Sequence, residues 1–137
     1  MRIESRTGRK EYPAIELYSF IEDFRNFNNF IPQDKVSDWK ADADHCSFRM
    51  DLLGKVALSI VDKEKGKLVK ISSDPSVSQY NFNLWVQLKE VDANDTAIRI
   101  TIEPLLNKVM LSMVKSHLKN FVDSVVDEIE KFSIPDQ

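Results

Sequence analysis

Six short runs of alternating apolar and polar residues fill the middle of the chain and restrict its fold more than any other feature. Compact polar connections separate several of them, among them "DADH", "KEKGK" and "DANDT". A period of two places every second side chain on one face of a strand, and connections this short join antiparallel neighbours. The pattern therefore predicts an antiparallel meander over residues 36–41, 46–52, 55–61, 67–72, 81–91 and 97–103.

One face of this meander is apolar over four consecutive runs and needs a cover. It carries Val56, Leu58, Ile60, Val69, Ile71, Phe82, Leu84, Val86, Leu88, Ile98, Ile100 and Ile102. In "NFNLWVQL", Trp85 breaks the alternation because it stands among amides on the opposite face. We expect its ring to lie over the stems of neighbouring side chains, Arg99 in particular. The competing interpretation is an anchor for a contact with another protein.

The last part of the chain, residues 107–132, has the period of one long helix with Asn107 as its N-cap. Its apolar positions form two faces about a quarter turn apart. The first half gathers Leu106, Met110, Met113, Val114, His117 and Phe121, and the second half Leu118, Phe121, Val122, Val125, Ile129 and Phe132. We expect the second half to pack directly on the sheet. The first half is expected to face a space bounded by the sheet, by segment 24–30 and by loop 72–80.

The N-terminal part predicts a strand followed by short helical segments. Residues 2–7 alternate weakly and would place Ser5 and Thr7 inward, unless the register is shifted by one residue. Residues 13–24 have the spacing of a short helix. After it, Phe27 and Phe30 would pin an irregular segment, either as a lid over a cavity or as ordinary aromatic packing.

Composition narrows the class of protein. A chain of 137 residues with 42% hydrophobic and 30% charged residues fits one globular domain, 1–137. The net charge of -3 argues against nucleic acid as the partner. No apolar stretch reaches the length of a membrane-inserted helix or a secretory leader, so we expect a cytoplasmic protein without membrane insertion. One cysteine allows no intrachain disulfide.

No motif for a cofactor or metal is present in the sequence. The three glycines are scattered and form no phosphate-binding loop, so we expect no nucleotide cofactor. His45 and Cys46 are adjacent, and on a strand they would point to opposite faces, where they cannot bind one metal. Asp51 and Glu103 lie at strand ends, but neither has a visible catalytic partner. Cys46 is most simply a small buried hydrophobe.

The order of elements resembles the helix-grip fold of the START and Bet v 1-like superfamily (SRPBCC), including polyketide cyclase/dehydrase and coenzyme Q-binding types. The segments "YSFIEDFRNFNNFIP", "DADHCSFRMDLLGKVALSIVDKE" and "FNLWVQLKEV" look similar to small bacterial members. The resemblance implies an α+β protein in which a curved antiparallel sheet of six or seven strands wraps around the long C-terminal helix. It also implies a cavity between them and ligands such as lipids, quinones or polyketides.

The predicted function is non-enzymatic binding of a small hydrophobic molecule in that cavity, by a monomer or weak homodimer without a cofactor. The predicted lining is Phe27, Phe30, Leu58, Phe82, Leu84, Val86, Ile100, Ile102, Met110, Met113, His117 and Phe121. One alternative is an enzyme of the cyclase or dehydratase type that uses His117 as acid or base. The competing interpretation is that His117 lies at the edge of the core, where a backbone carbonyl or water satisfies its hydrogen bonding. Another alternative is an interaction module whose cavity is vestigial.

Overall fold

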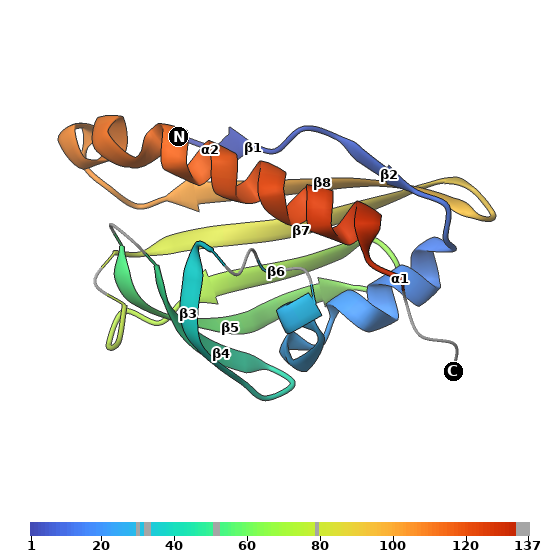
Figure 1. Ribbon diagram of the computed structural model, residues 1–137, viewed down its shortest axis with the longest axis horizontal. Helices are drawn as coiled ribbons and strands as arrows, with labels where there is room; N and C mark the ends of the chain where they lie inside the picture. The colour runs from blue at the N-terminus through green and yellow to red at the C-terminus, as the bar shows by residue number, and fades with distance from the viewer. Residues whose placement is uncertain (30, 32–33, 51–52, 79, 134–137) are drawn as a thin grey trace.

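The antiparallel meander predicted from the sequence is present and belongs to one curved sheet. The computed structural model describes residues 1–29, 31, 34–50, 53–78 and 80–133. These residues form an eight-stranded sheet in the order β1-β8-β7-β6-β5-β4-β3, and β2 also pairs with β8 (Figure 1). The strands are β1 (Ile3–Glu4), β2 (Gly8–Lys10), β3 (Val36–Ala41), β4 (His45–Met50), β5 (Gly54–Glu64), β6 (Leu68–Ser73), β7 (Phe82–Asp92) and β8 (Asp95–Pro104).

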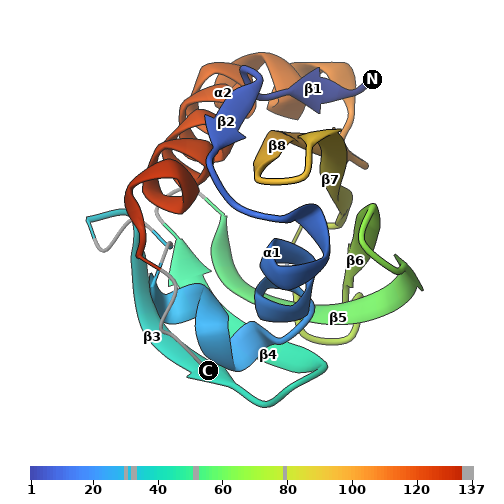
Figure 2. The same cartoon turned by 90° about the vertical axis from the view of Figure 1, so that its right-hand side faces the viewer.

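Three helical elements accompany the sheet: α1 (Ala14–Ile21), the 3-10 helix η1 (Phe24–Asn29) and the long α2 (Lys108–Lys131). Seen from the end, the sheet curves from β8 through β6 to β3, with α2 beside β8 and α1 across the near end (Figure 2). Phe20 of α1 stacks on Phe132 after α2, with ring centroids 4.9 Å apart. The two helices are therefore joined at this end of the molecule.

The predicted C-terminal helix and its cap are confirmed. The Asn107 side chain accepts a hydrogen bond from the Met110 N–H at 2.9 Å, which satisfies one of the amides left free at a helix start. The helix packs mainly against β8, β2 and β1. Its buried residues are Val114, Leu118, Phe121, Val122, Val125, Val126 and Ile129. Nearly all of them belong to the second half, which confirms that this half packs on the sheet.

The opening strand expected over residues 2–7 contains only β1, and β2 follows outside those bounds, which is why the sheet has one strand more than expected. Ser5 interrupts the ladder: its backbone N–H donates to the Ile100 carbonyl at 2.8 Å, and its hydroxyl accepts the Ile100 N–H at 2.9 Å. The next backbone N–H, that of Arg6, turns away from the sheet and donates to the Asp123 carboxylate at 2.7 Å. A side chain has thus replaced one backbone acceptor in the ladder.

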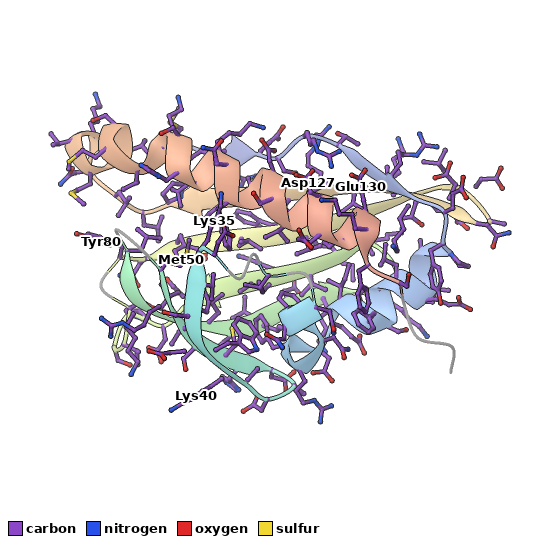
Figure 3. All side chains as sticks on the ribbon, in the orientation of Figure 1. Lys35, Lys40, Met50, Tyr80, Asp127 and Glu130 are labelled. Carbon is purple, nitrogen blue, oxygen red and sulfur yellow. The ribbon has the colours of Figure 1, made fainter. Side chains whose placement is uncertain are left out.

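Carboxylates of α2 hold this N-terminal segment in place. The Arg6 guanidinium forms ion pairs with Asp127 and Glu130, and the Arg9 backbone N–H donates to Glu130 at 2.9 Å. Figure 3 shows Asp127 and Glu130 on the last turns of α2, on the side of β2. The hydrogen bond from Arg6 is the main cause of the lowered pKa of Glu130. Glu130 therefore stays ionised and keeps bridging strand and helix.

The far edge of the sheet is irregular. β3 pairs with β4, but its register shifts between Ser37 and Lys40. Asp38 lies in this interval with a φ of 55°, the left-handed region that Asp tolerates better than most non-glycine residues. The extra residue is a β-bulge, which bends the strand and increases its twist.

Trp85 is half-buried on the outer face of the sheet and is covered locally. Its strand neighbours are Lys70 on β6 and Thr101 on β8. The Arg2 guanidinium lies 4.5 Å and the Lys70 ammonium 5.5 Å from the ring centroid, both within the range of cation–π attraction. The prediction that Arg99 lies beside the ring is wrong. Arg99 is opposite Gln87 and donates a hydrogen bond to the Thr7 hydroxyl.

Gly8 marks the closest approach of β2 to α2 and gives a test of this packing. A Cβ at this position would lie 2.5 Å from Cγ1 of Val126 and 3.0 Å from Oε2 of Glu130. We expect Gly8→Ala to lower the free energy of unfolding by about 1–3 kcal/mol, measured by urea denaturation. In a Val126→Ala background the clashing methyl group is gone, so the added cost should shrink. An equal cost in both backgrounds would contradict the proposed contact.

Replacing Trp85 tests whether its ring acts locally. Trp85→Ala removes the ring and two cation–π contacts of ~0.5–1 kcal/mol each at an exposed site, and we expect a loss of about 1–2 kcal/mol in denaturant unfolding. Trp85→Phe retains a ring and should lose less. Light scattering should give the same molecular mass for all three proteins. A wild-type dimer that becomes a monomer in Trp85→Ala would instead identify an interface.

A candidate ligand cavity

A small apolar cavity of about 50 Å³ lies between the concave face of the sheet and the second half of α2. Strands β5 to β8 supply Leu58, Ile71, Phe82, Leu84, Val86, Ile100 and Ile102, and strands β3 and β4 supply Trp39, Phe48 and Met50. The helix supplies Leu118, Phe121, Val122 and Val125, and the other described lining residues are Phe27, Ile31 and Leu53. All of these side chains are hydrocarbon, aromatic, indole or thioether groups.

Strand register explains why the sheet side of the cavity is continuous. Ile71, Leu84 and Ile102 lie opposite one another on β6, β7 and β8. Val86 and Ile100 form the adjacent pair two residues along. Because residues separated by two share a face, every strand that alternates in this register adds to the same wall. The alternation recognised in the sequence therefore builds the cavity directly.

Among the lining residues that the structure describes, Ile31, Trp39 and Met50 are half-buried and belong to the rim, whereas the others are buried. Trp39 stacks on Phe48 at a centroid distance of 5.6 Å. Met50 ends β4 opposite Val36, the first residue of β3, and Figure 3 shows it at that end of the strand pair. The part of the lining nearest to solvent thus belongs to β3, β4 and the segment after η1.

None of the lining residues that the structure describes is titratable, so this part of the wall has no group for general acid–base chemistry. Glu103 is on the outer face, where Asn83 donates to it at 3.2 Å; this bond and Arg2 lower its pKa. Asp51 lies outside the described residues. Cys46 is buried beside the cavity, opposite Leu58, and burial raises the pKa of its thiol to about 12.

Eight of the predicted site residues line the cavity: Phe27, Leu58, Phe82, Leu84, Val86, Ile100, Ile102 and Phe121. That they bind a ligand stays a prediction. Phe30 lies outside the described residues. Ser5 is used in the β-ladder and Thr7 is exposed, so neither offers its hydroxyl to the cavity.

The expected contribution of the first half of α2 is wrong. Met113 is 63% exposed, His117 is exposed, and Met110 is half-buried without lining the cavity. The physical reason is that an apolar helix face need not be covered, since much of a protein's accessible surface is apolar. The first turns of α2 extend past the sheet, as Figure 1 shows. The second half, predicted to pack on the sheet, provides the helical wall instead.

Sequence reasoning missed the aromatic part of the wall formed by Trp39 and Phe48. A signal was available, because Phe48 alternates with Cys46 on β4 and both are buried. Ile71 was recognised as part of the apolar face but not as a lining residue. The half-buried Ile31 carried no periodic signal, because it lies outside the regular elements.

Comparison with solved structures decides the fold. Norcoclaurine synthase from Thalictrum flavum, a point mutant in complex with a transition-state analogue, matches with a TM-score of 0.74 at 9% identity; the match covers 96% of this chain and 92% of that chain. The described residues have the same α+β arrangement of a curved antiparallel sheet and a long C-terminal helix. The chain has the helix-grip fold.

Other helix-grip structures agree over nearly the full length. A START superfamily protein from Mycobacterium smegmatis has a TM-score of 0.62 at 8% identity, covering 93% of this chain and 98% of that chain. A conserved protein from Geobacillus kaustophilus has a TM-score of 0.70 at 11% identity, covering 95% and 92%. At these identities the likeness concerns the fold. No protein-family model and no curated protein matches the sequence.

In the part of the chain that the structure describes, no helix combines the length and apolar character needed to cross a membrane. The same residues contain no cluster of three or more metal-ligating side chains.

Cysteine reactivity tests the burial of the wall beside the cavity. With a pKa of about 12, the Cys46 thiol is only ~10⁻⁴ ionised at pH 8, and it is also sterically covered. We expect iodoacetamide to alkylate the native protein at least 100-fold more slowly than the urea-unfolded protein, measured by mass spectrometry. A Cys46→Ala/Ser112→Cys variant, with its thiol on the exposed side of α2, should react at an ordinary rate. Equal rates for native and unfolded wild type would contradict this placement.

Proposed function

We propose that this protein binds a small molecule through an apolar portion of that molecule, in the cavity between the sheet and the second half of α2, without transforming it. The observation that carries the proposal is the uniform chemistry of the wall, which is apolar on the sheet, the helix and the rim. Such a surface favours hydrocarbon or ring carbon over water. The lining residues within the described part of the chain provide neither the paired polar groups that fix a polar substrate nor an acid or base for catalysis.

Size restricts the ligand further. Pockets for drug-sized ligands usually measure ~300–1,000 Å³, several times the present cavity. A ligand with more than a few carbon atoms would therefore bind only if the rim moves. Met50 is suited to this because its unbranched thioether adopts several shapes at low cost. Binding would then select a wider conformation, and the apolar area gained by the ligand would offset the lost packing.

The comparisons support this proposal at the level of the fold. One helix-grip neighbour, norcoclaurine synthase, was solved with a transition-state analogue bound. The neighbours therefore include a protein of this fold that holds a small molecule. For this chain, a lipid, quinone or polyketide-like compound fits the apolar wall, provided that its polar end stays at the rim.

Occupancy is tested first by native mass spectrometry of protein purified without detergent. A retained small molecule, released on denaturation, would support the proposal. A neutral apolar dye such as N-phenyl-1-naphthylamine tests binding to empty protein, with its fluorescence followed during titration. No retained molecule together with no dye binding would contradict the proposal.

Filling the cavity from the helix should separate binding from stability. Val125 lines the cavity, and Val114 is buried on the same helix without lining it. We expect Val125→Phe to weaken dye binding at least tenfold and to change the free energy of unfolding by less than about 1 kcal/mol, because its ring enters empty space. The control Val114→Phe should overpack the core, cost ~1–3 kcal/mol and keep dye binding. Wild-type affinity in Val125→Phe would place the dye elsewhere.

A further inference from the structure

The first half of α2 carries a row of exposed apolar side chains that the cavity does not use. Leu105, just before the helix, is 59% exposed, Val109 is 69% exposed and Met113 is 63% exposed. Val109 and Met113 are four apart in α2 and therefore lie on the same side of the helix, and Leu105 comes shortly before its first turn. We call these three residues the 105–113 stripe. Large apolar side chains this exposed, close together at the start of one helix, indicate a contact surface rather than scattered surface residues.

The charges beside the stripe have one sign. From Pro104 to Val122 the sequence contains Lys108, Lys115, Lys119 and His117 but no acidic residue, in a chain whose net charge is -3. At 100° per residue, the three lysines fall on one flank of the stripe and His117 on the other. The middle of the exposed face carries the small polar residues Ser112, Ser116 and Asn120. This half of α2 is thus a basic amphipathic surface on an acidic protein.

Two of these lysines are not used within the fold. Lys119 donates to the Glu4 carbonyl at 2.9 Å and pairs with Asp123 at 3.1 Å. Lys108 and Lys115 are exposed, and neither forms an ion pair with the residues that the structure describes. Their charge is therefore available to an external anionic surface.

The stripe sits at one end of the molecule and projects from it. The first turns of α2 extend past the sheet, as Figure 1 shows, and Figure 3 shows Tyr80 at the same end. The Leu105 N–H donates to the Asn81 carbonyl at 2.8 Å, which fixes the start of the stripe to the beginning of β7. A flat surface can reach such a projecting end without steric conflict with the rest of the domain.

We propose that the first half of α2 is a docking surface for an anionic lipid bilayer. Leu105, Val109 and Met113 would enter the boundary between headgroups and acyl chains, while Lys108 and Lys115 contact anionic headgroups. A helix with an apolar side and lysines beside it binds in the plane of a bilayer in this way. The proposal goes beyond ligand binding in the cavity and does not depend on it.

The observations favour a bilayer over a second copy of the chain. A twofold contact through the stripe would bring the same lysines of two copies together, where they repel each other. Stable protein interfaces also bury about 1,200–2,000 Å² with close shape complementarity, and three side-chain tips on one convex helix do not offer such a surface. A fluid bilayer needs no matching shape.

Vesicle co-sedimentation tests the proposal directly. We expect the full-length wild type to sediment with vesicles of phosphatidylcholine containing 30% phosphatidylglycerol, and at least tenfold less with phosphatidylcholine alone. Salt at 0.5 M should weaken the binding to anionic vesicles, because it screens the lysines. Absence of binding to anionic vesicles at low salt would overturn the proposal.

Matched variants separate the stripe from general effects of charge or hydrophobicity. Val109→Ser/Met113→Ser and Lys108→Gln/Lys115→Gln should each reduce vesicle binding at least tenfold. The controls Val61→Ser/Val91→Ser and Lys65→Gln/Lys89→Gln change residues of the β-hairpins that are also exposed, and these variants should bind as the wild type does. Circular dichroism should show that all variants are folded. Equal loss in stripe and control variants would overturn the proposal.

Two further measurements distinguish the remaining outcomes. Dye binding in the cavity should be unchanged in Val109→Ser/Met113→Ser, so failure of vesicle binding and failure of the proposed function would be seen separately. Light scattering at several concentrations should show no change of mass in this variant. A wild-type dimer that becomes a monomer would overturn the proposal and identify the stripe as a contact between copies.

Discussion

The packing of the second half of α2 on the concave face of the sheet is the interaction on which the rest of the structure depends. An antiparallel sheet of this composition has one apolar face, and α2 provides its main helical cover. Burying a side chain such as Leu118, Val122 or Ile129 contributes ~1.5–3 kcal/mol. Exposed ion pairs such as that of Arg9 with Asp95 usually contribute about 0–1 kcal/mol. The charged contacts of the N-terminal segment therefore set its position, whereas the buried face of α2 holds the fold together.

The cavity follows from the same packing. The sheet curves away from the helix between β6 and β3, and α2 packs mainly on β8, β2 and β1 at the other side. Aromatic residues such as Phe27 and Phe48 line the space that this curvature leaves. Ligand binding and stability would then depend on the same side chains. For any substitution in this wall, ligand affinity and the free energy of unfolding therefore have to be measured together. In the exposed first half of α2, binding and stability are not coupled in this way, because this half contributes little to the core.

Much of the fold was predictable because strand alternation is a local signal. The run 36–41 coincides with β3, and the other five runs lie within two residues of the observed strand ends at every boundary but one, the end of β5. The N-cap at Asn107 was readable from the sequence because capping depends on a single side chain and the adjacent turn. The end of β1 at Glu4 and the start of β2 at Gly8 were not predictable, because the break between them depends on Ser5 meeting Ile100 far along the chain.

The site was predictable only where a position on a strand determines what a side chain faces. The sheet residues of the cavity follow from alternation, and the helical ones do not. Hydrophobic spacing shows which side of a helix is apolar, but not whether another element covers it. For this reason Met113 and His117 were placed beside the cavity, while the structure places Val122 and Val125 there. The position of the end of β8 relative to the turns of α2 determines which half of the helix the sheet covers, and the sequence does not show this position.

The bulge in β3 has a consequence for the behaviour of the protein at high concentration. β3 is the edge strand beyond β4, and an edge with regular unpaired backbone groups can recruit strands from other molecules. The turn of Asp38 out of the extended conformation breaks that regularity, and Ser37 and Lys40 add polar groups. At the opposite side, β1 and β2 are only two and three residues long. Each edge of the sheet is thereby a poor template for intermolecular β-pairing, which protects a strand-rich chain from aggregation.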